Sequence, residues 1–167
     1  METEMDLKAV LSDLAPEIMG SVVETCEAVL QKSAFAVDNS CIVDRITNKQ
    51  RYISSIGASN ARFQGLFCVG VGVEGCQFLF KDIHESRDIL DLLGELANNM
   101  CGACCQRKPF VDAFGVLIQS PPVASDGGEM YFPKAVSLLG SVSTGIAKLT
   151  FGFVASTHFL DSHLTPF

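Results

Sequence analysis

The sequence predicts an α+β fold: a mainly antiparallel sheet with long helices packed on one face. Two observations lead to this prediction. Apolar residues recur at helical spacing near the start of the chain and again from about residue 86. The stretches between and after these two regions are short, rich in β-branched and aromatic residues, and separated by Gly, Asn and Ser. A helix, several strands, a helix and several more strands indicate an antiparallel sheet rather than alternating β-α units.

The chain as a whole has the composition of one globular domain, residues 1–167. Nearly half of its residues (48%) are apolar, and no linker or repeat divides it. A net charge of −7 without Lys/Arg runs argues against nucleic acid or an anionic membrane as partner. No apolar run reaches the roughly 18 residues of a membrane span, and the first twenty residues lack signal-peptide features. Seven cysteines without framework spacing indicate reduced thiols, so we expect a soluble, cytoplasmic protein.

The first element is predicted to be a helix over about residues 5–31. Its apolar positions follow helical spacing and are Val10, Leu11, Leu14, Ile18, Val22, Val23, Cys26 and Leu30. Pro16 interrupts this pattern. Because proline lacks the backbone N–H and clashes with the preceding turn, we expect a kink or a break into two helices near Ala15.

Short strands are predicted after this helix. The first group is expected at 41–47, 51–57, 63–72 and 75–81. Gly72 and Gly75 bracket Val73 and Glu74, which predicts a tight hairpin turn between the last two strands of this group. The second group is expected at 112–119, 129–133, 135–142 and 147–156, with a turn at 125–129. The apolar tail, residues 156–167, has no clear period.

A second helix is predicted over about residues 86–107, and it separates apolar from polar residues. The apolar side holds Leu93, Leu96, Ala97, Met100 and Cys104. The opposite side holds Asp91, Glu95, Asn98, Gly102 and Cys105. An ordinary solvated face would favour Lys, Glu and Gln, whereas Asn and especially Gly, at about 1 kcal/mol relative to Ala, weaken a helix. This composition favours a functional face, where Gly102 would let another backbone or a partner approach closely.

The polar side resembles the signature of the CheC/CheX chemotaxis phosphatases. That signature is Asp or Ser, three residues, Glu, two residues, Asn, then twenty-two residues and Pro. Here Asp91, Glu95, Asn98 and Pro121 match it. The surrounding "GELANNMCG" and "QSPPV" are similar to the family's helix and proline segment. The chain carries one such motif, whereas CheC-type members commonly carry two, so it resembles the CheX-type branch more closely. Asn99 stands where the family usually has Met, and the spacing favours Asn98 as the active asparagine.

The resemblance implies a protein aspartyl-phosphate phosphatase that acts on a phosphorylated CheY-like response regulator. Asn98 would orient the attacking water, since a carboxamide both donates and accepts hydrogen bonds. Glu95 would pair with the active-site lysine of the receiver domain. The protein would need no cofactor or metal of its own, because Mg²⁺ belongs to the receiver. The remaining residues with supporting or docking roles would be Asp91, Asn99, Gly102 and Pro121.

Three further expectations complete this interpretation. CheX-type members imply a homodimer. The family usually has another helix between the hairpin and the motif helix, and residues 81–89 look too short to hold it. A non-catalytic CheX-like binding module, which holds a response regulator or another signalling protein, is the alternative function.

The cysteines of the motif helix form a C-x-x-C-C pattern, Cys101, Cys104 and Cys105. A structural zinc site usually needs two ligand pairs, and no second Cys/His pair is evident. Buried reduced cysteine is therefore the favoured interpretation, with no bound zinc and no structural disulfide.

Overall fold

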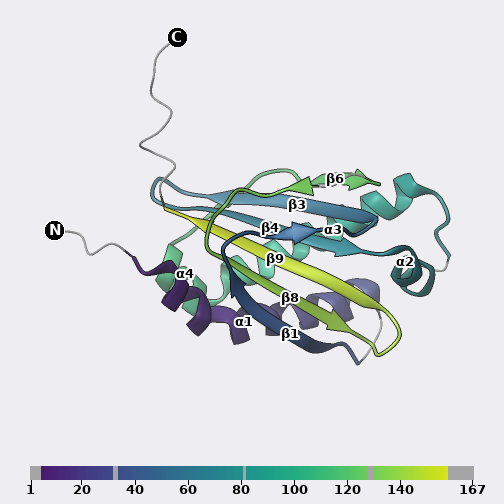
Figure 1. Cartoon of the computed structure of the whole chain (residues 1–167), viewed down its shortest axis with the longest axis horizontal. Helices are drawn as coiled ribbons and strands as arrows, with labels where there is room; N and C mark the ends of the chain where they lie inside the picture. The colour runs from purple at the N-terminus through teal and green to yellow at the C-terminus, as the bar shows by residue number, and fades with distance from the viewer. Residues whose placement is uncertain (1–4, 32–33, 81, 128–129, 158–167) are drawn as a thin grey trace, which may run out of the picture.

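The structure is a computed structural model, and it describes residues 5–31, 34–80, 82–127 and 130–157. Within these ranges, seven strands form one antiparallel sheet (Figure 1). Five of them lie side by side in the order β1 (Ala36–Val43), β8 (Ser137–Ser143), β9 (Lys148–Ser156), β4 (Gln64–Val71) and β3 (Tyr52–Ser59). The short β5 (Ile118–Gln119) and β6 (Val123–Asp126) pair with different stretches of β3. The predicted α+β class is confirmed.

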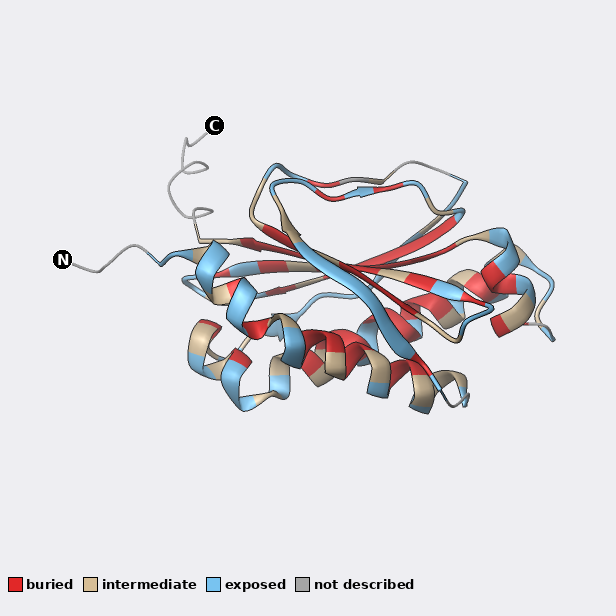
Figure 2. Cartoon of the chain, turned by 60° about the horizontal axis from the view of Figure 1, so that its bottom comes forward, coloured by how far each residue is buried: buried red, intermediate tan, exposed pale blue. Residues whose placement is uncertain are grey.

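Helices cover one face of this sheet, and the buried residues lie between the two layers (Figure 2). The long α1 (Leu7–Leu30) and α3 (Ser86–Gln106) pack against each other and against the strands. Two short helices, α2 (Val73–Leu79) and α4 (Lys108–Phe114), flank α3 in sequence. On the other face, β2 (Thr47–Asn48) pairs with β7 (Met130–Tyr131), and a small cluster of Ile46, Cys68, Phe132 and Val154 is buried there. None of the helices in the described ranges is long and apolar enough to cross a membrane.

The first helix matches its predicted range but does not break at Pro16. It begins after Asp6, whose side chain accepts a hydrogen bond from the Ala9 amide at 3.2 Å, and it runs without interruption from Leu7 to Leu30. Pro16 and Ser12 are both exposed. The Ser12 carbonyl, which loses its helical donor to the proline ring, can therefore bind water, and this makes the interruption tolerable.

The predicted hairpin at Gly72–Gly75 and the strand at 75–81 are wrong, because this segment forms α2. Its buried residues, Cys76 and Leu79, follow helical spacing. Gly75 is needed for close packing rather than for a turn. A Cβ added there would lie 2.8 Å from Val71 Cγ2 and 3.3 Å from the Lys148 carbonyl oxygen. The helix expected between the sheet and the motif helix therefore exists, but it precedes residues 81–89.

The predicted strand at 112–119 is also partly wrong, since its first residues belong to α4. Phe110 and Phe114 lie one helical turn apart, and both are buried. They contact Phe63, Phe67 and Phe153, and the ring centroids of Phe63 and Phe114 are 4.2 Å apart. The helix ends at Gly115, which has φ of 77°. β3, β4, β8 and β9 lie close to their predicted places. β1 begins at residue 36 rather than 41, and β6 at 123–126 was not predicted and overlaps the expected turn at 125–129. Most of the tail 156–167 lies outside the described residues.

Candidate functional site

The polar and apolar sides of α3 are those predicted from its sequence. Its apolar side faces the core, where the side chains of Leu93, Leu96, Ala97, Met100 and Cys104 are all at most 2% exposed. Its other side is open to solvent and carries the exposed residues Asp91, Glu95, Asn98 and Asn99, with the partly exposed Gly102 and Cys105. The burial prediction for this helix is therefore confirmed, and the three polar residues of the motif are free to meet a partner.

An open groove of about 770 Å³ runs between α3 and the segment that contains β6. The three polar motif residues contribute to one wall. The lining residues are Arg87, Leu90, Asp91, Gly94, Glu95, Asn98, Pro122 and Ala124. The structure thus brings Asp91, Glu95 and Asn98 together on one accessible surface, as the helical spacing predicts.

The proline that lines this groove is Pro122, the residue after the one selected by the motif spacing. A Cβ at Gly94 would lie 3.6 Å from Pro122 Cγ, an ordinary van der Waals contact, so Pro122 lies close against α3 at this position. Pro121 is exposed and does not line the groove, and its carbonyl accepts a hydrogen bond from Ser120 Oγ at 3.2 Å. The Pro-Pro dipeptide indicated which segment matches the proline of the signature, but its spacing did not determine which of the two proline rings faces α3.

The segment before these prolines is fixed to β3 by two hydrogen bonds. The Ser120 amide donates to the Gly57 carbonyl at 2.8 Å, and the Gly57 amide donates to Ser120 Oγ at 3.0 Å. One residue earlier, Gln119 is paired with the buried Ala58. Because paired residues of antiparallel strands point to the same face, the Gln119 side chain lies on the helix side of the sheet.

The two adjacent asparagines have different partners. Asn99 Nδ2 donates to the Glu95 carbonyl at 2.8 Å, which is a local contact within α3. Asn98 instead accepts from Gln119 Nε2, at 3.2 Å to its backbone oxygen and 3.4 Å to its Oδ1. Sequence reasoning missed Gln119, because a contact across 21 residues leaves no local pattern.

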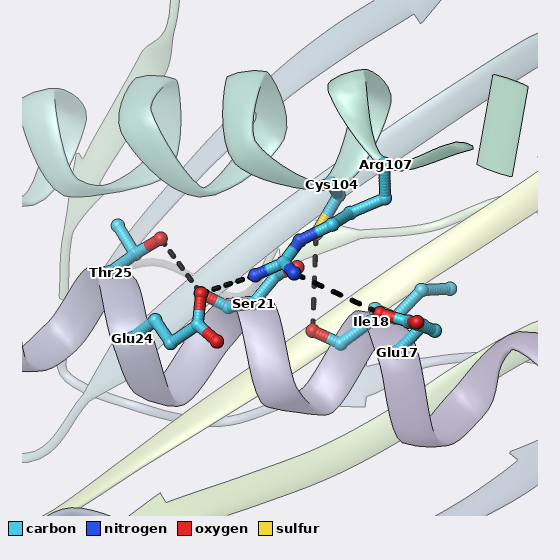
Figure 3. Close-up of polar contacts among 7 residues, drawn as sticks. All are labelled: Glu17, Ile18, Ser21, Glu24, Thr25, Cys104 and Arg107. Atoms are coloured by element: carbon cyan, nitrogen blue, oxygen red, sulfur yellow. Dashed lines mark hydrogen bonds and ion pairs between the residues drawn. The ribbon is translucent and has the colours of Figure 1, made fainter. Parts of the chain in front are cut away.

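The opposite side of α3 is anchored to α1 (Figure 3). The Arg107 guanidinium pairs with the carboxylates of Glu24 and Glu17, and the Cys104 thiol lies 4.0 Å from the Ile18 carbonyl oxygen. Burial raises the pKa of Cys104 to about 12, so this thiol keeps its proton at neutral pH. These contacts hold the motif helix from behind while its polar side stays open.

The other two cysteines of α3 form a close pair of thiols. Cys101 Sγ and Cys105 Sγ are 3.9 Å apart, and none of the seven cysteines of the chain is in a disulfide bond. Their hydrogen bond raises the pKa of the buried Cys101, with burial adding to this effect, and lowers the pKa of the half-buried Cys105. Within the described part of the chain, no three His, Cys, Asp or Glu side chains are grouped to hold a metal ion. The absence of zinc from the purified protein stays a prediction.

Comparison with known proteins gives matches at the level of structure alone. No family model and no curated protein matches the sequence. A CheC-like superfamily protein from Shewanella sp. PV-4 superposes with a TM-score of 0.71 at 11% identity, over 91% of this chain and 99% of that one. The CheX of a CheX–CheY–BeF3–Mg complex from Borrelia burgdorferi superposes with a TM-score of 0.66 at 12% identity, over 84% of this chain and 96% of that one. The FliM middle domain from H. pylori superposes with a TM-score of 0.60 at 4% identity, over 91% of this chain and 92% of that one. The chain therefore has the fold of CheX- and CheC-like proteins.

Proposed function

Starting from the CheX- and CheC-like fold, we propose that this protein binds a phosphorylated CheY-like response regulator and hydrolyses its aspartyl phosphate. One observation supports the proposal above all others. Asp91, Glu95 and Asn98, the residues that resemble the phosphatase signature, lie on the exposed side of one helix and line one open groove. CheX, which shares the fold of this chain, has been solved in complex with CheY, so a receiver domain is the natural partner to test.

The chemistry asks little of the protein. A phosphoaspartate is an activated acyl phosphate, and its hydrolysis requires a water molecule in line with the phosphorus and the departing carboxylate oxygen. The Asn98 carboxamide would hold that water, since it accepts through Oδ1 and donates through Nδ2. It would orient the water and would not act as a base. Mg²⁺ on the receiver would neutralise charge on the phosphoryl oxygens.

Glu95 would dock the helix. It lies three residues before Asn98, so the two side chains project from neighbouring turns of the same face. Its exposed carboxylate could pair with the lysine of a receiver active site, and this contact would register Asn98 over the phosphoryl group. Asn99, which is bonded to the Glu95 carbonyl, would have no direct part in the reaction.

A non-catalytic binding module is the second candidate. The FliM middle domain from H. pylori shares this fold, and a shared fold does not by itself specify catalysis. In this case α3 would still dock a signalling protein, and the groove would serve recognition only.

Phosphate release from a phosphorylated receiver domain, measured with titrated binding, separates the two candidates. With the enzyme, Asn98→Ala should slow release about a hundredfold while affinity stays nearly constant, which corresponds to about 2.7 kcal/mol of transition-state stabilisation. Glu95→Ala should weaken both affinity and rate, because its contact forms before the reaction. Asn99→Ala is the matched control and should change neither. Binding without release above the receiver's own decay would refute the enzyme and leave the binding module.

A further inference from the structure

We infer that Gln119 is a positioning residue for Asn98: its side-chain amide fixes the orientation of the carboxamide that holds the attacking water. The inference rests on the proposed phosphatase function and adds a residue outside the Asp91, Glu95, Asn98 and Pro121 signature.

The first support is that the backbone of Gln119 is itself fixed. It belongs to β5, in register with Ala58, and the next residue exchanges two hydrogen bonds with Gly57. A side chain on a paired strand starts from a defined backbone position, so only its own torsions need to be ordered for its far end to hold another group. Gln119 therefore connects the sheet to the exposed side of α3.

The second support is the path of the side chain along the helix. Gln119 Nε2 donates to both oxygens of Asn98, whereas Gln119 Oε1 lies 3.6 Å from the position that a Cβ of Gly102 would take. Asn98 and Gly102 are one helical turn apart. The carboxamide of Gln119 thus lies across this turn, within van der Waals reach of Gly102.

The third support is that an asparagine carboxamide can adopt two orientations of similar shape. Its oxygen and nitrogen ends have nearly the same shape, and rotation about its last torsion exchanges them at small cost. A donor at a fixed place selects the orientation with Oδ1 toward that donor. Because Oδ1 has two lone pairs, one can accept from Gln119 while the other still accepts a proton of the attacking water. Without Gln119, Asn98 would sample orientations that do not hold the water.

The test compares two variants with a matched control. Gln119→Met keeps the length of the side chain and removes the donor, whereas Gln119→Glu keeps the shape and replaces the donor with an acceptor. Gln106→Met makes the same chemical change at an exposed residue of α3. Dephosphorylation at saturating receiver should slow about five- to tenfold in both Gln119 variants, the loss expected for one neutral hydrogen bond. Receiver affinity and thermal unfolding should stay at wild-type values, and Gln106→Met should match the wild type throughout.

A spectroscopic measurement tests the contact without any reaction. The side-chain amide signals of Asn98 can be assigned in a ¹H–¹⁵N spectrum by their loss in Asn98→Ala. They should shift in Gln119→Met and stay unchanged in Gln106→Met.

Three outcomes would overturn the inference, and they are distinguishable from failure of the proposed function. An active wild type whose rate is unchanged in both Gln119 variants would refute the positioning role alone. Equal losses of rate and affinity would mean that Gln119 contacts the receiver rather than acting through Asn98. Unshifted Asn98 signals in Gln119→Met would exclude the contact itself. A wild type that releases no phosphate would instead refute the phosphatase function on which the inference rests.

Discussion

Gly102 offers a substitution in which stability and binding should change in opposite directions. Alanine is the better helix former, and Gly102→Ala should stabilise α3 by about 0.5–1 kcal/mol. The structure allows this gain, since the nearest atom to the new Cβ would be Gln119 Oε1 at 3.6 Å, an ordinary van der Waals contact. For a chain of this size, such a gain raises the unfolding temperature by about 1–4 °C. The added methyl group would, however, stand on the surface where the partner is expected to approach closely.

The expected result is a more stable protein that binds its receiver less well. Forcing one methyl group into a packed contact typically costs about 1–3 kcal/mol, which corresponds to about 5- to 150-fold in affinity. The assay is calorimetric unfolding of the free protein together with titration of the receiver. Gly20→Ala is the matched control: Gly20 lies inside α1, a Cβ there would meet nothing within 4 Å, and it does not line the groove. That variant should gain similar stability with unchanged binding.

Two results would refute this reasoning. A lower unfolding temperature for Gly102→Ala would mean that the space beside Gln119 is already filled. Unchanged affinity would mean that the glycine does not serve close approach of the partner.

Two further predictions concern the core and the thiols. Gly75→Ala should lower the unfolding temperature relative to Gly20→Ala, because its Cβ would lie 2.8 Å from Val71 Cγ2; equal unfolding temperatures would contradict the packing described for α2. Cys105 should be alkylated well before Cys104. The pKa of Cys105 is lowered by the hydrogen bond to Cys101, so its reactive thiolate forms as pH rises through a lower value than for an ordinary thiol, whereas the pKa of Cys104 is raised to about 12. Peptide mass spectrometry after a short iodoacetamide pulse measures the order, and faster labelling of Cys104 would contradict it.

The sequence predicted α3 well because that helix is long enough to display its period. Twenty-one residues hold several turns, so the alternation of Leu93, Leu96 and Met100 with Glu95 and Asn98 could be read directly. The seven residues of α2 hold fewer than two turns, and their aromatic and glycine content favoured a hairpin instead. Tertiary packing decided that segment, and no local pattern records tertiary packing.

The candidate site was predictable only in its local part. Glu95 and Asn98 are three residues apart on one helix, so their shared exposure follows from helical geometry. Gln119 and Pro122 reach the same surface through the register of β5 and β6 on β3. That register depends on the whole sheet, and a single sequence without its partners in space does not specify it.

The prolines between β5 and β6 have a consequence for how this molecule behaves at high concentration. Pro121 and Pro122 lack backbone N–H groups, so two consecutive positions on this border of the sheet offer no donor to an incoming strand. A strand from another molecule could not build a continuous ladder across them, and this protects the border against edge-to-edge aggregation. Such protection matters here, because Pro122 also lines the groove that would receive a partner. Replacing either proline to adjust the groove would also remove part of this protection.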